Sequence, residues 1–307
     1  MVVPTDYPNI QAGIDASASG DTVLVLDGVY SGEGNYELLI GYDVIGNLLI
    51  TSLNGPENTI IDCQGQGYGI KIYGYNHLLV LNGISVINGF SEDFGGIQIM
   101  QTQDFYPVII NCIIRNNTAT EYSGGGISTF LSNPIIKNCL IIENDAPLGA
   151  GIHVSNWSSP TIINSIIQDN YYADGEWLPT FTYCNLSFDF YNDELNNITA
   201  DPHFINPESN NYHLHVESPC INSGDPTTGL DPDSTRIDIG PFYYQLELKG
   251  DANFDSNIDV LDIVITINVI LELMETYNAQ LWAMDMNNDE IIDVLDIVLV
   301  VNQILDN

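Results

Sequence analysis

The chain has 307 residues, of which 45% are hydrophobic and 15% charged, so it is long enough for one large domain or two smaller ones with a sizeable core. Its 41 Asp and Glu residues against 5 Lys and Arg give a formal net charge of −36, which excludes nucleic acid as a partner because phosphate binding needs a basic surface. The sequence contains no run of about 18 apolar residues, so no membrane-inserted helix is predicted. The scattered cysteines include no CxxC pair that would indicate zinc.

The N-terminal segment predicts a helical cap followed by the start of a coil. In "DYPNIQAGIDAS", Tyr7, Ile10 and Ile14 have helical spacing, and Asp6 and Pro8 suit the start of a helix. We expect the following "DTVLVLDGVY" to begin the first coil. The opening "MVVPTDYPNIQ" has no basic segment followed by an apolar one, so we expect no signal peptide within this sequence, although one could have been removed from it.

The central region contains an internal repeat. Three segments align, "YPVIINCIIRNN", "NPIIKNCLIIEN" and "SPTIINSIIQDN", with steps of 27 and then 26 residues between their prolines. Between such segments lie the short stretches "GIKI", "GIQI", "GIST" and "GIHV". All are too short and too rich in β-branched residues for helices. Such a unit cannot bury its apolar side alone, whereas stacked copies can, so the repeat predicts a parallel β-helix.

Equivalent positions of the repeat predict the interior of the β-helix. We expect one apolar column formed by Ile70, Ile97, Ile127 and Ile152. We expect small residues at a bend, rather than catalytic thiols, at Cys112, Cys139 and Ser165. Asparagine tolerates a left-handed backbone, and stacked asparagines can bond to one another. The recurring residues are Asn111, Asn138 and Asn164 in one set, and Asn117, Asn144 and Asn170 in the other.

The outward residues of the same strands predict a row along one face. The row comprises Lys71, Gln98, Ser128 and His153, beside loops that carry Glu92, Asp93, Glu121 and Asp145, with Tyr73, Tyr75, Phe130 and Trp157 nearby. Aromatic rings stack on sugars and carboxylates act as acid and base, so this face suits a polysaccharide. The catalytic candidates are Lys71, Glu121, Asp145 and His153.

Turn-rich segments, "ADPHFINPESNNYHLHVESPCINSGDP" and "DPDSTRIDIGPFYY", predict a closing cap in which His203, His213 and His215 are structural. With "VPTDYPNIQAGIDASASGDTVLVLDGVY" and the coils, they make residues 1–245 resemble secreted bacterial right-handed parallel β-helix repeat proteins, whose fold is related to that of pectate lyases. The resemblance implies this fold and a secreted or cell-surface location. It implies no single activity, because the fold hosts lyases, hydrolases, adhesins and stalks.

A non-catalytic interpretation therefore stays open for every candidate on this face. Outward polar residues occur in any strand, and His153 also fits a surface histidine without a catalytic role. The five basic residues have no lyase signature around them, and the coils contain no DD pair of the polygalacturonase type. Enzyme and non-catalytic rod remain alternatives.

The C-terminal region contains one acidic phrase twice, as "GDANFDSNIDVLDIVITINVIL" and, 34 residues later, "MDMNNDEIIDVLDIVLVVNQIL". Oxygen-bearing residues at alternate positions, then a carboxylate three residues after the ninth, are the ligand pattern of a calcium loop. The first loop offers Asp251, Asn253, Asp255, Asn257, Asp259 and Asp262; the second offers Asp285, Asn287, Asp289, Ile291 through its backbone carbonyl, Asp293 and Asp296. A solvated acidic helix is the alternative, but two carboxylates at about 4 Å repel by about 4 kcal/mol at an effective dielectric constant of about 20.

The last ligand is aspartate where an EF-hand has glutamate, and "PFYYQLELKG" before the first loop is strand-like rather than helical. Residues 248–307 thus resemble a dockerin domain, which implies two calcium ions and a cohesin-type partner. By that resemblance Val260, Leu261, Val294 and Leu295 help to choose the partner, and the identical pairs imply a near-twofold surface that can dock either way round. The alternative is that these pairs pack between the two helices. Ser256 and Glu290 stand where glycine is usual, at a cost of about 1–2 kcal/mol each in a left-handed turn.

The sequence thus predicts a mainly β protein with two modules. A right-handed parallel β-helix with an N-terminal helical cap covers residues 1–245, and a small α-helical domain with two calcium loops covers 248–307. We expect the β-helix to engage, and as an enzyme to degrade, polysaccharide while the tail docks it to a scaffold or cell-surface partner. The alternative is a non-catalytic spacer or adhesin with a calcium-stabilised anchor.

Overall fold

The computed structural model describes residues 1–41, 46–74, 77–102, 105–121, 124–174, 178–188, 195–232, 234–244, 248–253, 257–271, 273–274, 276, 278–289 and 291–306. The chain divides into two compact units, Met1–Asp201 with Asn222–Phe242, and Pro202–Ile221 with Tyr243–Asn307. The predicted module boundary falls at residues 245–247, which lie outside the described residues, so it stays a prediction.

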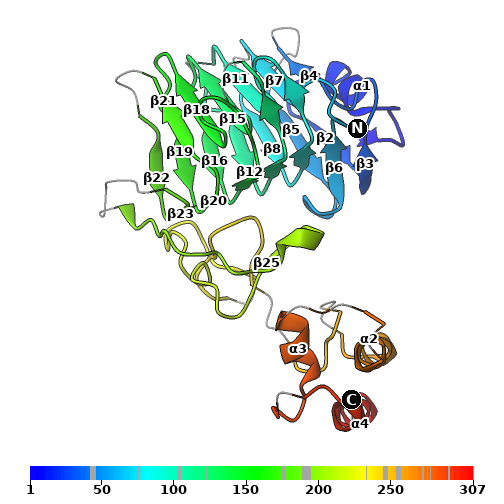
Figure 1. Ribbon diagram of the computed structural model, residues 1–307. Helices are drawn as coiled ribbons and strands as arrows, with labels where there is room; N and C mark the ends of the chain where they lie inside the picture. The colour runs from blue at the N-terminus through cyan, green and yellow to red at the C-terminus, as the bar shows by residue number, and fades with distance from the viewer. Residues whose placement is uncertain are drawn as a thin grey trace. The chain divides into compact units, whose positions relative to one another are not determined.

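The first unit is a parallel β-solenoid built from three sheets that the chain visits in turn (Figure 1). The first sheet contains β1 (Val2–Val3), β2 (Asp21–Val25), β5 (Leu48–Ser52), β8 (Leu79–Asn82), β12 (Val108–Ile110), β16 (Ile135–Lys137), β19 (Thr161–Ile163) and β22 (Thr180–Thr182). The second contains β3 (Gly28–Tyr30), β6 (Thr59–Asp62), β9 (Ser85–Ile87), β13 (Ile113–Arg115), β17 (Leu140–Ile142), β20 (Ile166–Ile167) and β23 (Asn185–Leu186).

The third sheet contains β4 (Leu38–Ile40), β7 (Ile70–Tyr73), β11 (Ile97–Met100), β15 (Ile127–Phe130), β18 (Ile152–Ser155) and β21 (Tyr171–Ala173). A short parallel pair, β10 (Phe90–Ser91) and β14 (Thr118–Ala119), lies outside these sheets. Each coil is thus one pass through three short strands, as the repeat predicted.

The predicted isoleucine column is confirmed. Ile70, Ile97, Ile127 and Ile152 pair in register along the third sheet, and all are buried. Burying one such side chain stabilises the fold by about 1.5–3 kcal/mol, which the coil obtains only when its neighbours are stacked on it. The cysteines at the bends, Cys112 and Cys139, are also fully buried, and the N–H of Cys139 donates to Ser165 Oγ at 3.1 Å. These residues serve packing, as expected.

The two sets of asparagines have different roles. Asn111, Asn138 and Asn164 adopt φ angles of 53°, 50° and 49°, the left-handed conformation that asparagine tolerates. In the second set, Asn117 Nδ2 donates to Asn144 Oδ1 at 3.0 Å, and Asn144 Nδ2 donates to Asp169 Oδ2 at 2.9 Å. The predicted third member, Asn170, is wrong. Asp169 takes its place in this stack. Asn117 and Asn144 each follow a residue with a left-handed backbone, Asn116 and Glu143, whereas the residue before Asp169 is not left-handed, so this turn is one residue shorter.

Both ends of the solenoid are covered. The helix α1 (Ile10–Asp15) buries Ile10 and Ile14, which confirms the cap. Its start differs from the prediction at Asp6 and Pro8, because Asn9 is the N-cap and its Oδ1 accepts the N–H of Ala12 at 2.8 Å. At the other end the segment 222–242 turns back, and the N–H of Gly240 donates to the carbonyl of Asn164 at 2.8 Å.

The second unit contains a hairpin and three helices. The hairpin consists of β24 (Phe204–Asn206) and β25 (Asn211–Leu214), with a 3₁₀ turn (Pro207–Ser209) between them. His203 and His215 belong to it through a backbone hydrogen bond of 2.8 Å, in accord with a structural role. The helices are α2 (Val260–Ile270), α3 (Asn278–Met284) and α4 (Val294–Asp306), of which α2 and α4 pack against each other. None of the helices in the described residues is long and apolar enough to cross a membrane.

Candidate functional sites

The second acidic loop, residues 285–296, is organised by hydrogen bonds from its own backbone to its carboxylates. Asp285 Oδ1 accepts the N–H of Asp289 at 3.1 Å, and Asp289 Oδ1 accepts the N–H of Ile291 at 2.9 Å. Asp296 is fully buried, and its Oδ1 accepts the N–H groups of Met286 and Asn287 at 2.9 and 3.3 Å. These bonds from the backbone to the carboxylates curl the loop around its oxygen atoms.

The last carboxylate of this loop also begins the helix that follows. Asp296 Oδ2 accepts the N–H of Asp293 at 2.9 Å, and Asp293 Oδ1 accepts the N–H of Leu295 at 2.7 Å. These two backbone N–H groups at the start of α4 have no acceptor within the helix, and the loop carboxylates accept them instead. Helix α3 ends directly before this loop, and no prediction was made for that segment from the sequence.

The first loop repeats these contacts at equivalent positions. Asp262 is fully buried; its Oδ1 accepts the N–H of Asn253 at 3.2 Å and its Oδ2 accepts that of Asp259 at 2.8 Å. Asp259 caps α2 in turn. The candidate ligand Asp255 lies outside the described residues, as do Ser256 and Glu290, where glycine is usual. The described residues 241–244 and 248–250 contain no strand, and the middle of the segment expected to be strand-like, residues 245–247, lies outside the described residues.

The donor set fits a hard divalent cation. Every candidate ligand offers an oxygen atom, and Asp262 and Asp296 are fully buried carboxylates, whose negative charge is costly to bury unless a cation compensates it. In the part of the chain that the structure describes, no three acidic, histidine or cysteine side chains converge closely enough to hold a metal. The loops thus have the chemistry of calcium sites, and the structure gives no coordination geometry for them.

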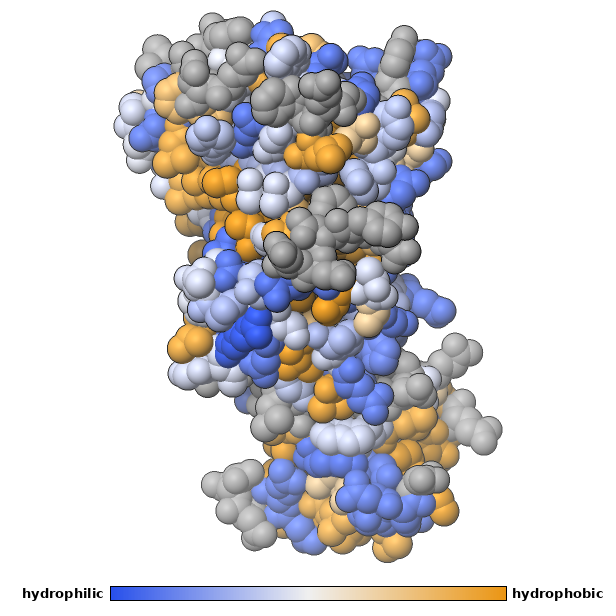
Figure 2. Space-filling model, turned by 90° about the vertical axis from the view of Figure 1, so that its left-hand side faces the viewer, coloured by the Kyte–Doolittle hydropathy of each residue, from blue (hydrophilic) through white to orange (hydrophobic). Residues whose placement is uncertain are grey.

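The helices that follow the two loops present matching apolar surfaces. Val260 and Leu261 at the start of α2 are 64% and 58% exposed, and Val294 and Leu295 at the start of α4 are 62% and 59% exposed. The alternative that these pairs pack between the helices is therefore wrong. Val264 and Val298, one turn later, are exposed as well. Figure 2 shows hydrophobic patches between hydrophilic ones on the helical tail, in its lower part.

The predicted row on the third sheet is present, and its candidate residues form no ion pair with one another in the described contacts. Lys71 pairs in register with Gln98, Gln98 with Ser128, and Ser128 with His153. Glu121 and Asp145 are exposed, and neither forms an ion pair with Lys71 in the described contacts. The loop residues Glu92 and Asp93 are exposed too, and Tyr75 lies outside the described residues.

His153 differs from the surface histidine that the sequence indicated. It is only 5% exposed, and its ring stacks on Tyr172 with the centroids 5.7 Å apart. Nε2 lies 4.0 Å from Asp174 Oδ2, and neither ring nitrogen has a hydrogen-bond partner among the described residues. Burial lowers the pKa of His153, and the Asp174 carboxylate opposes that shift in part, so burial favours the neutral imidazole. Sequence reasoning missed Asp174, although it directly follows the strand stacked on that of His153.

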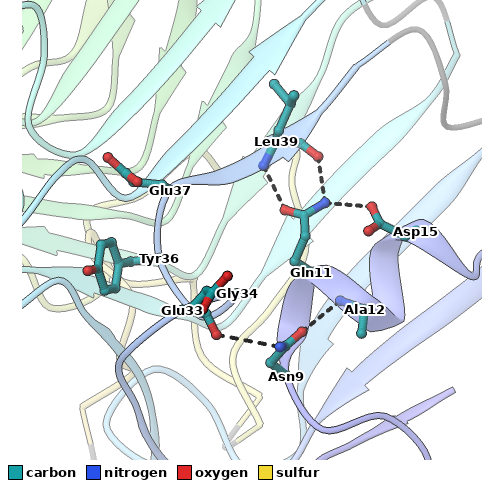
Figure 3. A pocket seen from close by; sticks show the side chains of 9 residues that line it. All are labelled: Asn9, Gln11, Ala12, Asp15, Glu33, Gly34, Tyr36, Glu37 and Leu39. Carbon is teal, nitrogen blue, oxygen red and sulfur yellow. Dashed lines mark hydrogen bonds between the residues drawn. The ribbon is translucent and has the colours of Figure 1, made fainter.

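An open pocket of about 760 Å³ lies between α1 and the segment that leads into β4. Figure 3 shows Gln11 at its centre: Gln11 Nε2 donates to Asp15 Oδ1 at 2.7 Å, and Oε1 accepts the N–H of Leu39 at 2.8 Å. Asp15, Glu33 and Glu37 contribute three carboxylates, and no basic residue lines the pocket. Its charge suits a neutral or cationic ligand better than an acidic sugar. The sequence did not reveal this pocket, because its residues come together only when α1 folds onto the first coil.

Comparisons with known proteins agree with the two-part architecture. The family model described as a right handed beta helix region matches residues 50–211, and that of the dockerin type I domain matches residues 249–305. The chain belongs to the right-handed β-helix family and carries a dockerin type I domain, a calcium-binding class of domain.

Other similarities are weak. A crystal structure of pectate lyase Pel9A aligns with 76% of this chain and 90% of its own, at 13% identity and a TM-score of 0.31, too distant a likeness to support an inference about activity. No curated protein matches the chain.

Proposed function

We propose that this is a secreted, calcium-dependent two-module protein whose tail docks a β-helical rod onto a cohesin-type partner. The observation that carries the proposal is the pair of exposed apolar dipeptides, Val260–Leu261 and Val294–Leu295, each at the start of a helix whose loop has calcium chemistry. Large apolar side chains exposed at equivalent positions of a duplicated unit favour an interaction surface. Each loop would hold one calcium ion, which compensates the buried carboxylates of Asp262 and Asp296.

The negative charge of the tail limits the polarity and charge that the binding face of a partner can have. Residues 248–307 contain twelve Asp and Glu and one lysine, Lys249. A partner face should therefore be apolar at its centre and neutral or basic at its rim, because an acidic rim would be repelled. Since the two dipeptides are identical, we expect either one to occupy the centre of the interface.

The test is binding of the full chain to immobilised cohesin modules, with calcium and with chelator. Replacing one dipeptide by aspartates should leave binding nearly unchanged, because the other dipeptide serves in the reversed orientation. Replacing both should reduce affinity by at least about 100-fold, since central apolar anchors carry most of an interface's energy. Leu273→Asp, a 72% exposed residue outside both helices, is the matched control. Calcium-independent binding, or full binding by the double variant, would disprove the docking surface.

For the β-helix we propose polysaccharide engagement without a catalytic role for the predicted face. The observations behind it are that Lys71 forms no ion pair with Glu121 or Asp145 in the described contacts, and that His153 is buried. A screen of neutral, amino and uronate polysaccharides, read by both binding and product release, tests it. Product release that is lost in Lys71→Ala or His153→Ala would establish an enzyme instead. Neither binding nor turnover would favour the inert spacer.

A further inference from the structure

Lys249 lies where the segments leading into the two acidic loops meet. Its Nζ donates to the carbonyl of Trp282 at 2.6 Å and to that of Asp285 at 2.5 Å. The same ammonium lies 4.6 Å from the centroid of the Trp282 ring. Asp285 is the first candidate ligand of the second loop, and Asp251, the first of the other loop, follows Lys249 by two residues. One side chain thus touches the start of the second loop from the start of the first.

Backbone and side-chain contacts reinforce this junction. The N–H of Gly250 donates to the carbonyl of Ala283 at 2.8 Å, and Gln280 Nε2 donates to the carbonyl of Ala252 at 3.1 Å. Gln280 is buried, and Gly250 faces the second segment, because an added Cβ there would be in van der Waals contact with Met286 Sδ at 3.5 Å. Residues 249–252 are therefore held against residues 280–286 along their length.

The role of Lys249 is positional rather than one of charge balance. As the one lysine among twelve acidic residues of the tail, it would be expected to pair with a carboxylate, yet its described hydrogen bonds go to two carbonyl oxygens at the end of α3. A cation near the last carbonyls of a helix is favoured by the helix dipole, and the bond to the Asp285 carbonyl fixes the backbone from which the second loop begins.

We propose that Lys249 couples the two loops, so that filling one with calcium favours filling of the other. Ordering either loop fixes one side of the junction, and through Lys249 this removes part of the entropy that the other loop must lose on binding. The inference rests on the proposed calcium binding but goes beyond it, because two independent loops would serve docking equally well.

The test is calcium titration of the full-length chain by isothermal titration calorimetry, for the wild type, Lys249→Met and Lys249→Arg. We expect the wild type to take up two ions with positive cooperativity. Lys249→Met should bind them independently, with the weaker site about tenfold weaker, and Lys249→Arg should keep part of the cooperativity because a guanidinium also donates to two carbonyls. Lys137→Met, in the solenoid, is the matched control and should titrate as the wild type.

The outcomes separate this inference from the proposed function. Wild type that takes up no calcium overturns both. Wild type that binds two ions while Lys249→Met keeps its affinity and cooperativity overturns the coupling alone. Circular dichroism of the calcium-loaded variants checks that the helices form, and Gln280→Leu, which removes the second contact at the junction, should show the same loss of cooperativity if Lys249→Met fails to fold. Unchanged cooperativity in Gln280→Leu would then count against the junction.

Discussion

Replacing Asp296 by alanine is expected to destabilise the helical tail selectively. The fully buried carboxylate accepts three backbone N–H groups, those of Met286, Asn287 and Asp293. Hydrogen bonds to a charged group contribute about 1.5–3 kcal/mol each, and these donors regain some water in the variant, so about 1 kcal/mol per bond or about 3 kcal/mol in total is a conservative estimate. A domain of about 60 residues has only about 3–9 kcal/mol of stability. The loss corresponds to a fall of about 12–24 °C in the melting temperature of the tail.

Differential scanning calorimetry of the full chain with excess calcium measures this effect. The tail transition should move down, while the solenoid transition should not, because the carboxylate contacts no coil residue in the described hydrogen bonds. Asn302→Ala, at an exposed position of the same helix, should leave both transitions in place. The melting temperature of the tail in Asp296→Asn should lie between those of the wild type and Asp296→Ala, since asparagine keeps one acceptor oxygen. A shift of less than about 4 °C in the alanine variant would show that this carboxylate does not hold the loop.

Three further predictions concern metal and pH. Chelation should melt the tail at lower temperature and leave the solenoid transition in place, and a calorimetric trace without any calcium-dependent change would contradict the calcium loops. Because burial lowers the pKa of His153, its contribution to stability is present above the unfolded pKa of about 6.5 and lost as the pH falls through the folded pKa. His153→Phe should therefore stabilise the solenoid at pH 5 more than at pH 8, and equal shifts at both would refute this. Burial raises the pKa of Asp169, so the contribution of this group to stability is greatest below about pH 4 and is lost as the pH rises through the folded pKa. Asp169→Asn should therefore raise the melting temperature of the solenoid at pH 7 but not at pH 3.5. A lower melting temperature of the variant at pH 7 would mean that the negative charge is needed.

The solenoid was predictable because its determinants are local and repeated. A column such as Ile70, Ile97, Ile127 and Ile152 follows from spacing alone, since a strand buries alternate residues and each coil repeats the pattern. The left-handed conformation of Asn111, Asn138 and Asn164 is likewise a property of the residue type. The prediction of the hydrogen-bonded stack of Asn117 and Asn144 was wrong at its third member. That turn has one left-handed residue fewer, so Asp169 stands in the place assigned to Asn170.

The sites on the solenoid were less predictable because burial depends on segments that spacing does not place. His153 stands on the outward side of its strand, yet Gly149 packs against its backbone and Tyr172 covers its ring. The acidic pocket forms only where α1 meets the first coil. In the tail, the ligand positions followed from the duplicated phrase, but Lys249 became visible as a contact between loops only in three dimensions.

Ion binding and partner docking are physically linked in the tail. Val260 and Leu261 lie between the N-cap Asp259 and Asp262, and the two carboxylates bond reciprocally to backbone N–H groups across this turn. Asp262 is at once the last candidate ligand of the loop and the third residue of the helix, so whatever orients its oxygens also fixes the turn that exposes the apolar pair. Val294 and Leu295 stand in the same relation to Asp293 and Asp296. A cation in the loop would therefore determine whether α2 and α4 begin where the apolar pairs are exposed, and a partner that binds these pairs would in turn strengthen cation binding by the same factor.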